Sequence, residues 1–173
     1  MKQVDWFARK FDFTSEQNIL PALLERLVGT PIRIKKKLEG INPAFYPVKA
    51  DGKWSILEHI GHLSDLEPLW HGRLEDILEG REELRPTDLS NRKTDEANHN
   101  ARGTEELVHA FTALREITVA RLEALTEAQL FLSALHPRLR TPMRTIDLFL
   151  FVAEHDDHHL AKMTEIHRTL LKP

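Results

Sequence analysis

The chain has 173 residues, of which 41% are hydrophobic and 29% charged, with a formal net charge of −3, ten histidines and no cysteine. This length corresponds to one domain that buries roughly two thirds of its unfolded surface. The absence of cysteine excludes disulfides, thiolate metal ligands and a cysteine nucleophile. Histidine, aspartate and glutamate therefore remain for metal or acid–base chemistry.

The charge balance and the apolar segments argue against nucleic-acid and membrane partners. The 24 Lys and Arg against 27 Asp and Glu give no global positive field for a nucleic acid. The longest uninterrupted apolar stretch, 148–153, is far shorter than the ~20 residues that span a bilayer. The N-terminus has charged residues around Trp6 and Phe7 and lacks the apolar centre of a signal peptide. We therefore expect a cytoplasmic protein.

Apolar residues in steps of three and four predict a first helix over 15–38. Ser15 is its expected N-cap and Gly40 its expected stop. Pro21 falls inside this segment, and the run 29–31 (Gly-Thr-Pro) interrupts it. We therefore expect a late start, a kink or two helices in series.

A second helix is predicted over 55–78, after a loop over 42–53 that is rich in proline and glycine. Pro68 is expected to kink this helix. Residues 80–103 are polar and lack a sustained period. They form a long connection with room for a short helix.

The third and fourth long helices are predicted over 104–125 and 145–171. Thr104 and Thr145 are their expected N-caps. Residues 126–132 add a turn of helix, and the segment around the prolines at 137 and 142 is a loop. No β-period and no internal repeat is visible.

Four amphipathic helices in one domain predict an all-α four-helix bundle. We assign a single domain, 1–173, with an N-terminal extension over 1–14 and the bundle over approximately 15–171. The connection of about 24 residues between the second and third helices is long enough to cross the bundle. A simple up-down-up-down order is therefore not required.

The last helix carries the histidine-rich segment 154–159, which reads EHDDHH. At ~100° per residue, His159 falls about 40° from His155, within the apolar arc that runs from Leu148, near 20°, to Met163, near 80°. Two imidazoles on one apolar stripe each need a partner for a donor and for an acceptor. Because residues at i and i+4 are neighbours, one divalent ion would satisfy His155 and His159 together.

A third ligand is expected from a facing helix, since two histidines leave a divalent ion under-coordinated. The second helix offers two candidates in 54–63, which reads WSILEHIGHL. His62 lies at the edge of the apolar stripe of this helix, and His59, about 60° away, is more central. Periodicity does not choose between them.

The segments 54–63 and 155–160 (HDDHHL) resemble those of the DinB/YfiT-like metal-dependent enzymes, as does the 137–146 loop. The resemblance spans roughly 15–171, and the two motifs together are more specific than either alone. It implies a four-helix bundle of up-down-down-up order with a long crossover between the second and third helices. It also implies one divalent ion, most often nickel or zinc, held by three histidines that fall on His62, His155 and His159.

Three neutral imidazoles leave a divalent ion with an open position, as in catalytic sites, where a bound water has its pKa lowered towards ~7. Relatives in the resembled family include hydrolases and enzymes that use bacillithiol or mycothiol. We therefore expect a metal-dependent hydrolase or a small-thiol-dependent S-transferase, with a small-molecule substrate and a low-molecular-weight thiol as a cosubstrate in the second case. The alternative is a stress-associated binding protein that is not an enzyme and has a structural or regulatory metal.

Three carboxylates are candidates to orient the ligands: Glu58 and Asp65, which flank His62, and Asp156, which lies near the stripe of the last helix. The competing interpretation is that they are solvated charges on helix faces. His158 and His71 are expected at the surface or at the rim of the site. Lys162 stands three positions after the last ligand, where relatives commonly have Gln. The role that this position has in relatives therefore does not transfer to this chain.

Two further alternatives concern the histidine spacing and the N-terminal aromatic residues. His155 and His159 have the spacing of the H-E-x-x-H zincin motif, but position 156 is Asp, which disfavours a metalloprotease. Trp6, Phe7, Phe11 and Phe13 either cover a partner surface in a homodimer or fold back on their own bundle. The sequence leaves both open.

Overall fold

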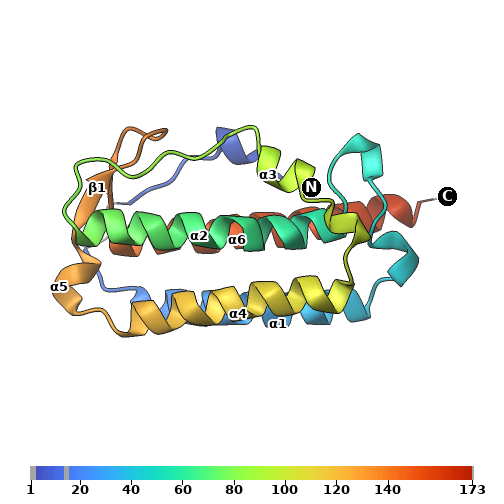
Figure 1. The fold of residues 1–173 in the computed structure, drawn as a ribbon, viewed down its shortest axis with the longest axis horizontal. Helices are drawn as coiled ribbons and strands as arrows, with labels where there is room; N and C mark the ends of the chain where they lie inside the picture. Colours follow the sequence, from blue (N-terminus) through green and yellow to red (C-terminus); the bar gives the residue numbers. More distant parts are fainter. Residues whose placement is uncertain (1–2, 14–15, 173) are drawn as a thin grey trace.

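A computed structural model describes residues 3–13 and 16–172 of the chain. Within these residues, four long helices form a bundle (Figure 1). They are α1 (Leu20–Glu39), α2 (Ile56–Leu78), α4 (Thr104–Glu123) and α6 (Thr145–Leu170). The predicted all-α four-helix bundle is thereby confirmed. None of the described helices is long and apolar enough to span a membrane.

The long helices of the bundle do not simply alternate in direction along the chain (Figure 1). Both α1 and α2 pack against α4 and α6. In Figure 1, α1 and α6 run in one direction, whereas α2 and α4 run in the other. Two helices that run the same way need a connection that returns along the bundle. The segment between α2 and α4, which we call the crossover (79–103), does this and contains α3 (Arg92–Glu96) and the 3-10 helix η4 (His99–Ala101).

The helix ends agree in part with those predicted. Helix α2 is capped by Ser55, whose hydroxyl accepts from the Glu58 N–H at 3.1 Å, and Pro68 lies within it. Helix α1 begins late, at Leu20, and ends at Gly40 as its C-cap. Ser15, the predicted cap of α1, lies outside the described residues.

Two predicted caps are wrong by one residue. Gly103 caps α4 and Arg144 caps α6, so Thr104 and Thr145 are the first helical residues. At α6 the carboxylate of Asp147 accepts the backbone N–H of Arg144 at 3.0 Å and also binds its guanidinium. The acidic residue at the third helical position therefore accepts a backbone N–H at the start of α6, and no threonine cap is needed.

A short β-hairpin, for which the sequence shows no β-period, precedes α6. Helix α5 (Glu127–Leu130) is followed by strands β1 (Ser133–Leu135) and β2 (Pro142–Arg144), which form an antiparallel hairpin. Three residues per strand are too few to show a period of two in the sequence. Strand β1 also binds the crossover, since Leu84 N donates to Leu135 O at 3.0 Å.

Two apolar clusters fill the bundle, one towards each end, and a layer of charged residues separates them. Arg115 of α4, 1% exposed, pairs with Glu67 of α2 at 2.6 Å and with Asp156 of α6. The hydroxyl of Thr30 on α1 donates to Asp156 at 2.8 Å, and that of Thr118 donates to Glu67. We call these five residues the ion layer. It joins all four long helices.

The N-terminal aromatic residues fold back on their own bundle. Trp6, in the 3-10 helix η1 (Trp6–Ala8), and Phe11 pack against Phe151 of α6 with ring centroids 4.9 and 5.0 Å away. Phe7 remains 57% exposed. Of the two alternatives for this cluster, the structure therefore shows the intramolecular contact.

Candidate metal centre

The three histidines predicted as ligands come together between α2 and α6. His155 and His159 lie one turn apart on α6, with their Nε2 atoms 3.0 Å from each other. The Nε2 atom of His62, on α2, lies 3.3 Å from that of His155. One ligand atom from each of the three residues lies within 4.8 Å of the other two. All three side chains are buried.

Three converging imidazole nitrogens fit a divalent cation. Zinc takes nitrogen ligands at about 2.0–2.1 Å in a tetrahedron, whose edge is then about 3.3–3.4 Å. The His62–His155 separation of 3.3 Å matches this edge, and the His155–His159 separation of 3.0 Å is slightly shorter. Without a cation, each pair of these nitrogens shares at most one proton, which leaves lone pairs facing each other.

Burial keeps the cluster neutral. Desolvation lowers the pKa of His62 to about 4, and it lowers the pKa of His155 and of His159 well below 6.5. The neighbouring imidazoles add to the effect, because each disfavours a positive charge on the next. Neutral imidazole is the form that binds a metal, so the site is ready to bind near pH 7.

The crossover fixes the orientation of His62. Its Nδ1 atom lies 2.9 Å from the hydroxyl of Thr94, on α3, and this hydroxyl donates to Asp65 at 2.9 Å. His99, on η4, contacts the same Asp65 carboxylate at 2.9 Å. If His62 donates from Nδ1, its Nε2 lone pair faces the cluster. Asp65 thus acts on His62 through Thr94. Neither Thr94 nor His99 was singled out by a pattern in the sequence.

The absence of a side chain at Gly61 lets the ring of His99 pack against α2. A Cβ atom at Gly61 would lie 2.3 Å from the ring of His99, so only glycine allows this close contact with α2. The result explains why glycine stands in the middle of a buried helix, where it costs about 1 kcal/mol relative to alanine. The glycine in the 54–63 motif therefore helps to orient His62, because it makes room for His99 beside Asp65.

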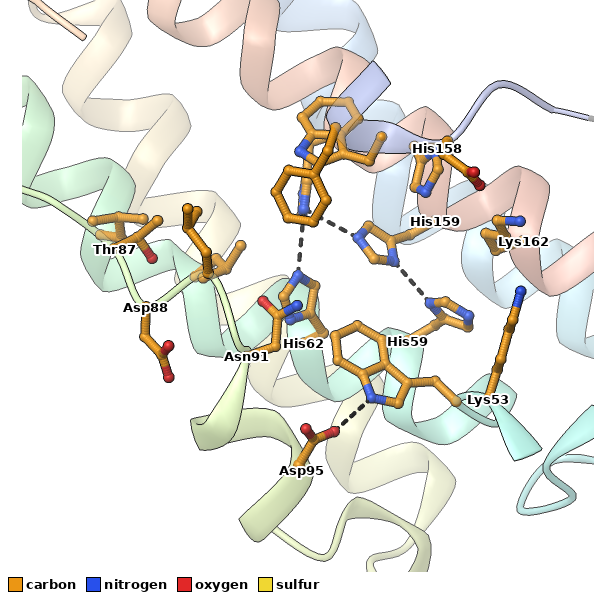
Figure 2. A pocket seen from close by; sticks show the side chains of 18 of the residues that line it. Lys53, His59, His62, Thr87, Asp88, Asn91, Asp95, His158, His159 and Lys162 are labelled. Carbon is orange, nitrogen blue, oxygen red and sulfur yellow. Dashed lines mark hydrogen bonds between the residues drawn. The ribbon is translucent and has the colours of Figure 1, made fainter. Parts of the chain in front are cut away.

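His59, the rival candidate for the third ligand, contacts the cluster through His159. Its Nδ1 atom is 2.8 Å from Nδ1 of His159 (Figure 2), whereas His155 contacts the Nε2 atom of the same ring. Desolvation lowers the pKa of His59 to about 3, so the ring is neutral. A neutral His59 can accept the Nδ1 proton of His159, which leaves Nε2 of His159 free as a ligand.

The other two carboxylate candidates point elsewhere. The Glu58 carboxylate turns back to accept the Ser55 N–H at 2.8 Å and pairs with Lys49 at 2.7 Å. Asp156 points into the bundle, towards Arg115 and Thr30, and belongs to the ion layer. Neither orients a ligand directly. Capping and the buried pairing with Arg115 account for their positions.

Four further histidines lie outside the candidate ligand set and its rival. His158, expected at the surface or at the rim of the site, is 7% exposed and is one of the residues lining the pocket beside the cluster; its ring centroid lies 5.5 Å from that of Trp6. His71 is half-buried and contacts the Thr118 hydroxyl at 2.6 Å. His99 and His136, which carried no signal in the sequence, are 2% exposed each. The N-terminal segment and the crossover bury more of the histidines than the four helices alone would.

A pocket of about 1210 Å³ opens onto the cluster. Lys53 and Lys162 lie on one side of His59 in Figure 2, and Thr87 and Asp88 of the crossover lie on the other side of the view. The Lys162 ammonium also pairs with Glu165 at 2.8 Å. All three clustered histidines line the pocket, so the candidate centre is accessible to a small molecule.

Aromatic rings surround the histidines. Trp54 lies 4.6 Å from the ring of His62 and donates from its indole to Asp95 at 2.7 Å. Trp6 and Trp70 contact the ring of His155 at 5.0 and 5.8 Å. These rings reduce the water around the cluster, which strengthens electrostatic interactions there.

Comparisons with known proteins agree with this architecture. The DinB superfamily profile matches residues 26–163. A solved structure of YfiT from Bacillus subtilis, described as a probable metal-dependent hydrolase with an unusual four-helix bundle topology, superposes with a TM-score of 0.78. It is 21% identical in sequence, and the match covers 94% of this chain and 93% of that one. No curated protein matches the chain. The chain belongs to the DinB superfamily.

Proposed function

We propose that this chain is a metal-dependent enzyme that acts on a small molecule, with His62, His155 and His159 as the ligands of one divalent ion. The convergence of their three Nε2 atoms at the base of an accessible pocket is the observation that carries the proposal. Structural zinc sites are usually closed by four protein ligands, whereas three ligands beside a pocket leave a position for a substrate or water.

The residues around the cluster have separate tasks in this proposal. Thr94 and Asp65 hold the Nδ1 proton of His62, and His59 holds that of His159, so that both rings keep their orientation. Trp6 and Trp54 limit the access of water. Zinc or nickel held by the three rings supplies a Lewis acid that favours the deprotonated form of a water or a thiol.

The reaction class is a hydrolysis or a small-thiol-dependent transfer. The description of YfiT as a probable hydrolase supports the first. The chain has no cysteine, so a transfer would use a thiol brought into the pocket. Cobalt-loaded protein distinguishes them: if a small thiol such as cysteine is the cosubstrate, its addition should produce a sulfur-to-cobalt charge-transfer band. A hydrolase that does not bind thiols should show none and should cleave nitrophenyl esters or amides.

Elemental analysis of untagged protein tests the proposal. We expect about one zinc or nickel ion per chain, and H62A, H155A and H159A should each lower zinc affinity strongly. The matched control is H109A, because His109 is exposed on α4. If the purified protein contains no metal and added zinc or nickel leaves its melting temperature unchanged, the proposal is wrong.

A structural or regulatory metal in a binding protein predicts a different pattern. Metal binding is then coupled to folding, so H155A and H159A should unfold or strongly destabilise the chain. An active-site metal predicts variants that keep most of their fold and lose catalysis. Urea unfolding of the zinc-loaded variants separates these outcomes.

A further inference from the structure

A second polar cluster lies in the same pocket, three helical turns from the histidines. Arg73 of α2 is 1% exposed, and its Nη2 atom is buried with no hydrogen-bond partner. Arg138, in the β1–β2 loop, also has a buried Nη2 atom with no partner. Both residues line the pocket, as does His136 between them in the chain. The two guanidinium groups therefore bring unused donors to one region.

Neither arginine has a carboxylate partner among the described residues. Asp76 is the acidic residue whose charge raises the pKa of Arg73. Its two carboxylate oxygens, however, already accept hydrogen bonds from Arg85 at 2.8 and 2.9 Å. Arg73 instead donates from Nε to the backbone oxygen of Arg85 at 3.1 Å. A buried guanidinium without a counter-charge is costly, and such groups are normally paired.

His136 does not supply the missing acceptors. Its Nδ1 atom accepts the backbone N–H groups of Arg138 and Leu139, both at 3.2 Å, and its Nε2 atom lies 3.1 Å from Nη1 of Arg73. A neutral imidazole accepts at only one of its nitrogens. Burial, with the adjacent arginines, lowers the pKa of His136 to about 4. Donors therefore outnumber acceptors in this cluster, which is the condition that an anion satisfies.

The pocket connects this cluster to the histidines along α2. Arg73 follows His62 by 11 residues, which places the two about 20° apart around the helix and ~16 Å apart along it. Leu66 and Leu69 lie between them on the same face, and both line the pocket. Phe151 closes the other side, 5.7 Å from the ring of His136. An apolar passage thus separates two polar ends.

We propose that Arg73 and Arg138 bind an anionic group of the substrate, a carboxylate or a phosphate, while its apolar middle lies along Leu66 and Leu69. The reacting bond then reaches the three histidines at the other end. This inference rests on the proposed function, since it names the class of substrate for that centre. A planar carboxylate fits one guanidinium fork, and a phosphate has enough oxygens for both arginines.

Calorimetric titration with three probes of equal chain length tests the proposal: hexanoate, hexyl phosphate and neutral hexanamide. The zinc-loaded wild type should bind at least one of the two anions about tenfold or more tightly than the amide. The anion that binds more tightly identifies the acceptor. R73Q and R138Q should lose this preference and leave the affinity for hexanamide and the zinc content unchanged.

The matched control is R102Q, because Arg102 pairs with Glu106 outside the pocket. If R73Q fails to fold, R73K and R138Q provide the test, since Arg138 is only partly buried. Anion affinity that is equal in the wild type, R73Q or R73K, and R138Q, with zinc still bound, overturns the subsite alone. Protein that binds no zinc but keeps an arginine-dependent preference for anions overturns the proposed function and leaves the subsite in place.

Discussion

The imidazoles of His59 and His159 face each other through their Nδ1 atoms, 2.8 Å apart. One ring belongs to α2 and the other to α6, so this contact joins the two helices that build the candidate metal centre. Only one of the two nitrogens carries a proton. If His159 binds a cation through Nε2, the proton lies on its Nδ1 and His59 is the acceptor.

Replacing His59 with alanine should lower zinc affinity by about 10- to 100-fold, the usual effect of removing the partner of a ligating histidine. The zinc stoichiometry should stay near one, because His59 is not a ligand. Competition with a chromophoric chelator measures the affinity. H167A, further along α6, is the control and should bind zinc as the wild type does. If H59A abolishes binding altogether, His59 is itself a ligand.

Gly61→Ala should destabilise the protein by about 1–3 kcal/mol, since the new methyl group collides with His99. It should also weaken zinc binding, because His99 shares the Asp65 carboxylate with Thr94. Gly29→Ala on α1 is the matched control. Its Cβ would meet its nearest atom at 3.9 Å, so this substitution should leave stability unchanged or increase it by about 1 kcal/mol. Equal urea midpoints for the two variants would contradict the packing argument.

Arg115→Met should cost about 3–5 kcal/mol, because it leaves the carboxylates of Glu67 and Asp156 buried without a counter-charge. Adding Glu67→Gln and Asp156→Asn to R115M should restore part of the loss. R121M is a control on the same helix: Arg121 forms a partly exposed pair with Glu75, so about 0–1 kcal/mol is expected. Urea unfolding measures all of these variants. An R115M that is as stable as R121M would show that the ion layer contributes little.

The metal-free protein should lose stability as the pH falls from about 6.5 towards 4. Burial lowers the pKa of His62 and of His136 to about 4, and that of His59 to about 3, whereas each returns to ~6.5 on unfolding. In this window the unfolded chain binds protons that the folded chain does not, so acid favours unfolding. Each such histidine contributes up to about 1.4 kcal/mol per pH unit.

Urea titrations at several pH values measure this slope. H136Q should reduce it by the equivalent of about one proton, since one buried neutral histidine is removed. A free energy of unfolding that is constant across the window would show that these histidines are accessible to protons in the folded state.

The sequence predicted the bundle and its long helices because the apolar stripes are long and regular. The late start of α1 followed from Pro21, and the end of α1 from Gly40. The β1–β2 hairpin escaped prediction, since three residues cannot display a period. The caps of α4 and α6 were misplaced because threonine beside a helix start fits both the cap and the first helical position.

For the candidate site, helical phase brought His155 and His159 to one face, and the structure places them together. Phase did not separate His59 from His62, because both lie near the same stripe and only the facing helix distinguishes them. Thr94 and Arg115 were beyond prediction for another reason. Each is a polar residue whose importance depends on contacts with segments distant in sequence, Thr94 with His62 and Arg115 with Asp156.

The crossover between α2 and α4 has a consequence for how related proteins diversify. Two helices that run the same way require a return segment, and here that segment supplies both the support of His62 and one wall of the pocket. The four long helices hold the ion layer and most of the apolar clusters; of the crossover, only Leu84 is a buried member of a cluster. Insertions and substitutions in 86–91, a segment that lines the pocket, can therefore change what the pocket accepts while the bundle stays intact. New substrate specificities can therefore evolve in this architecture through changes in the crossover alone.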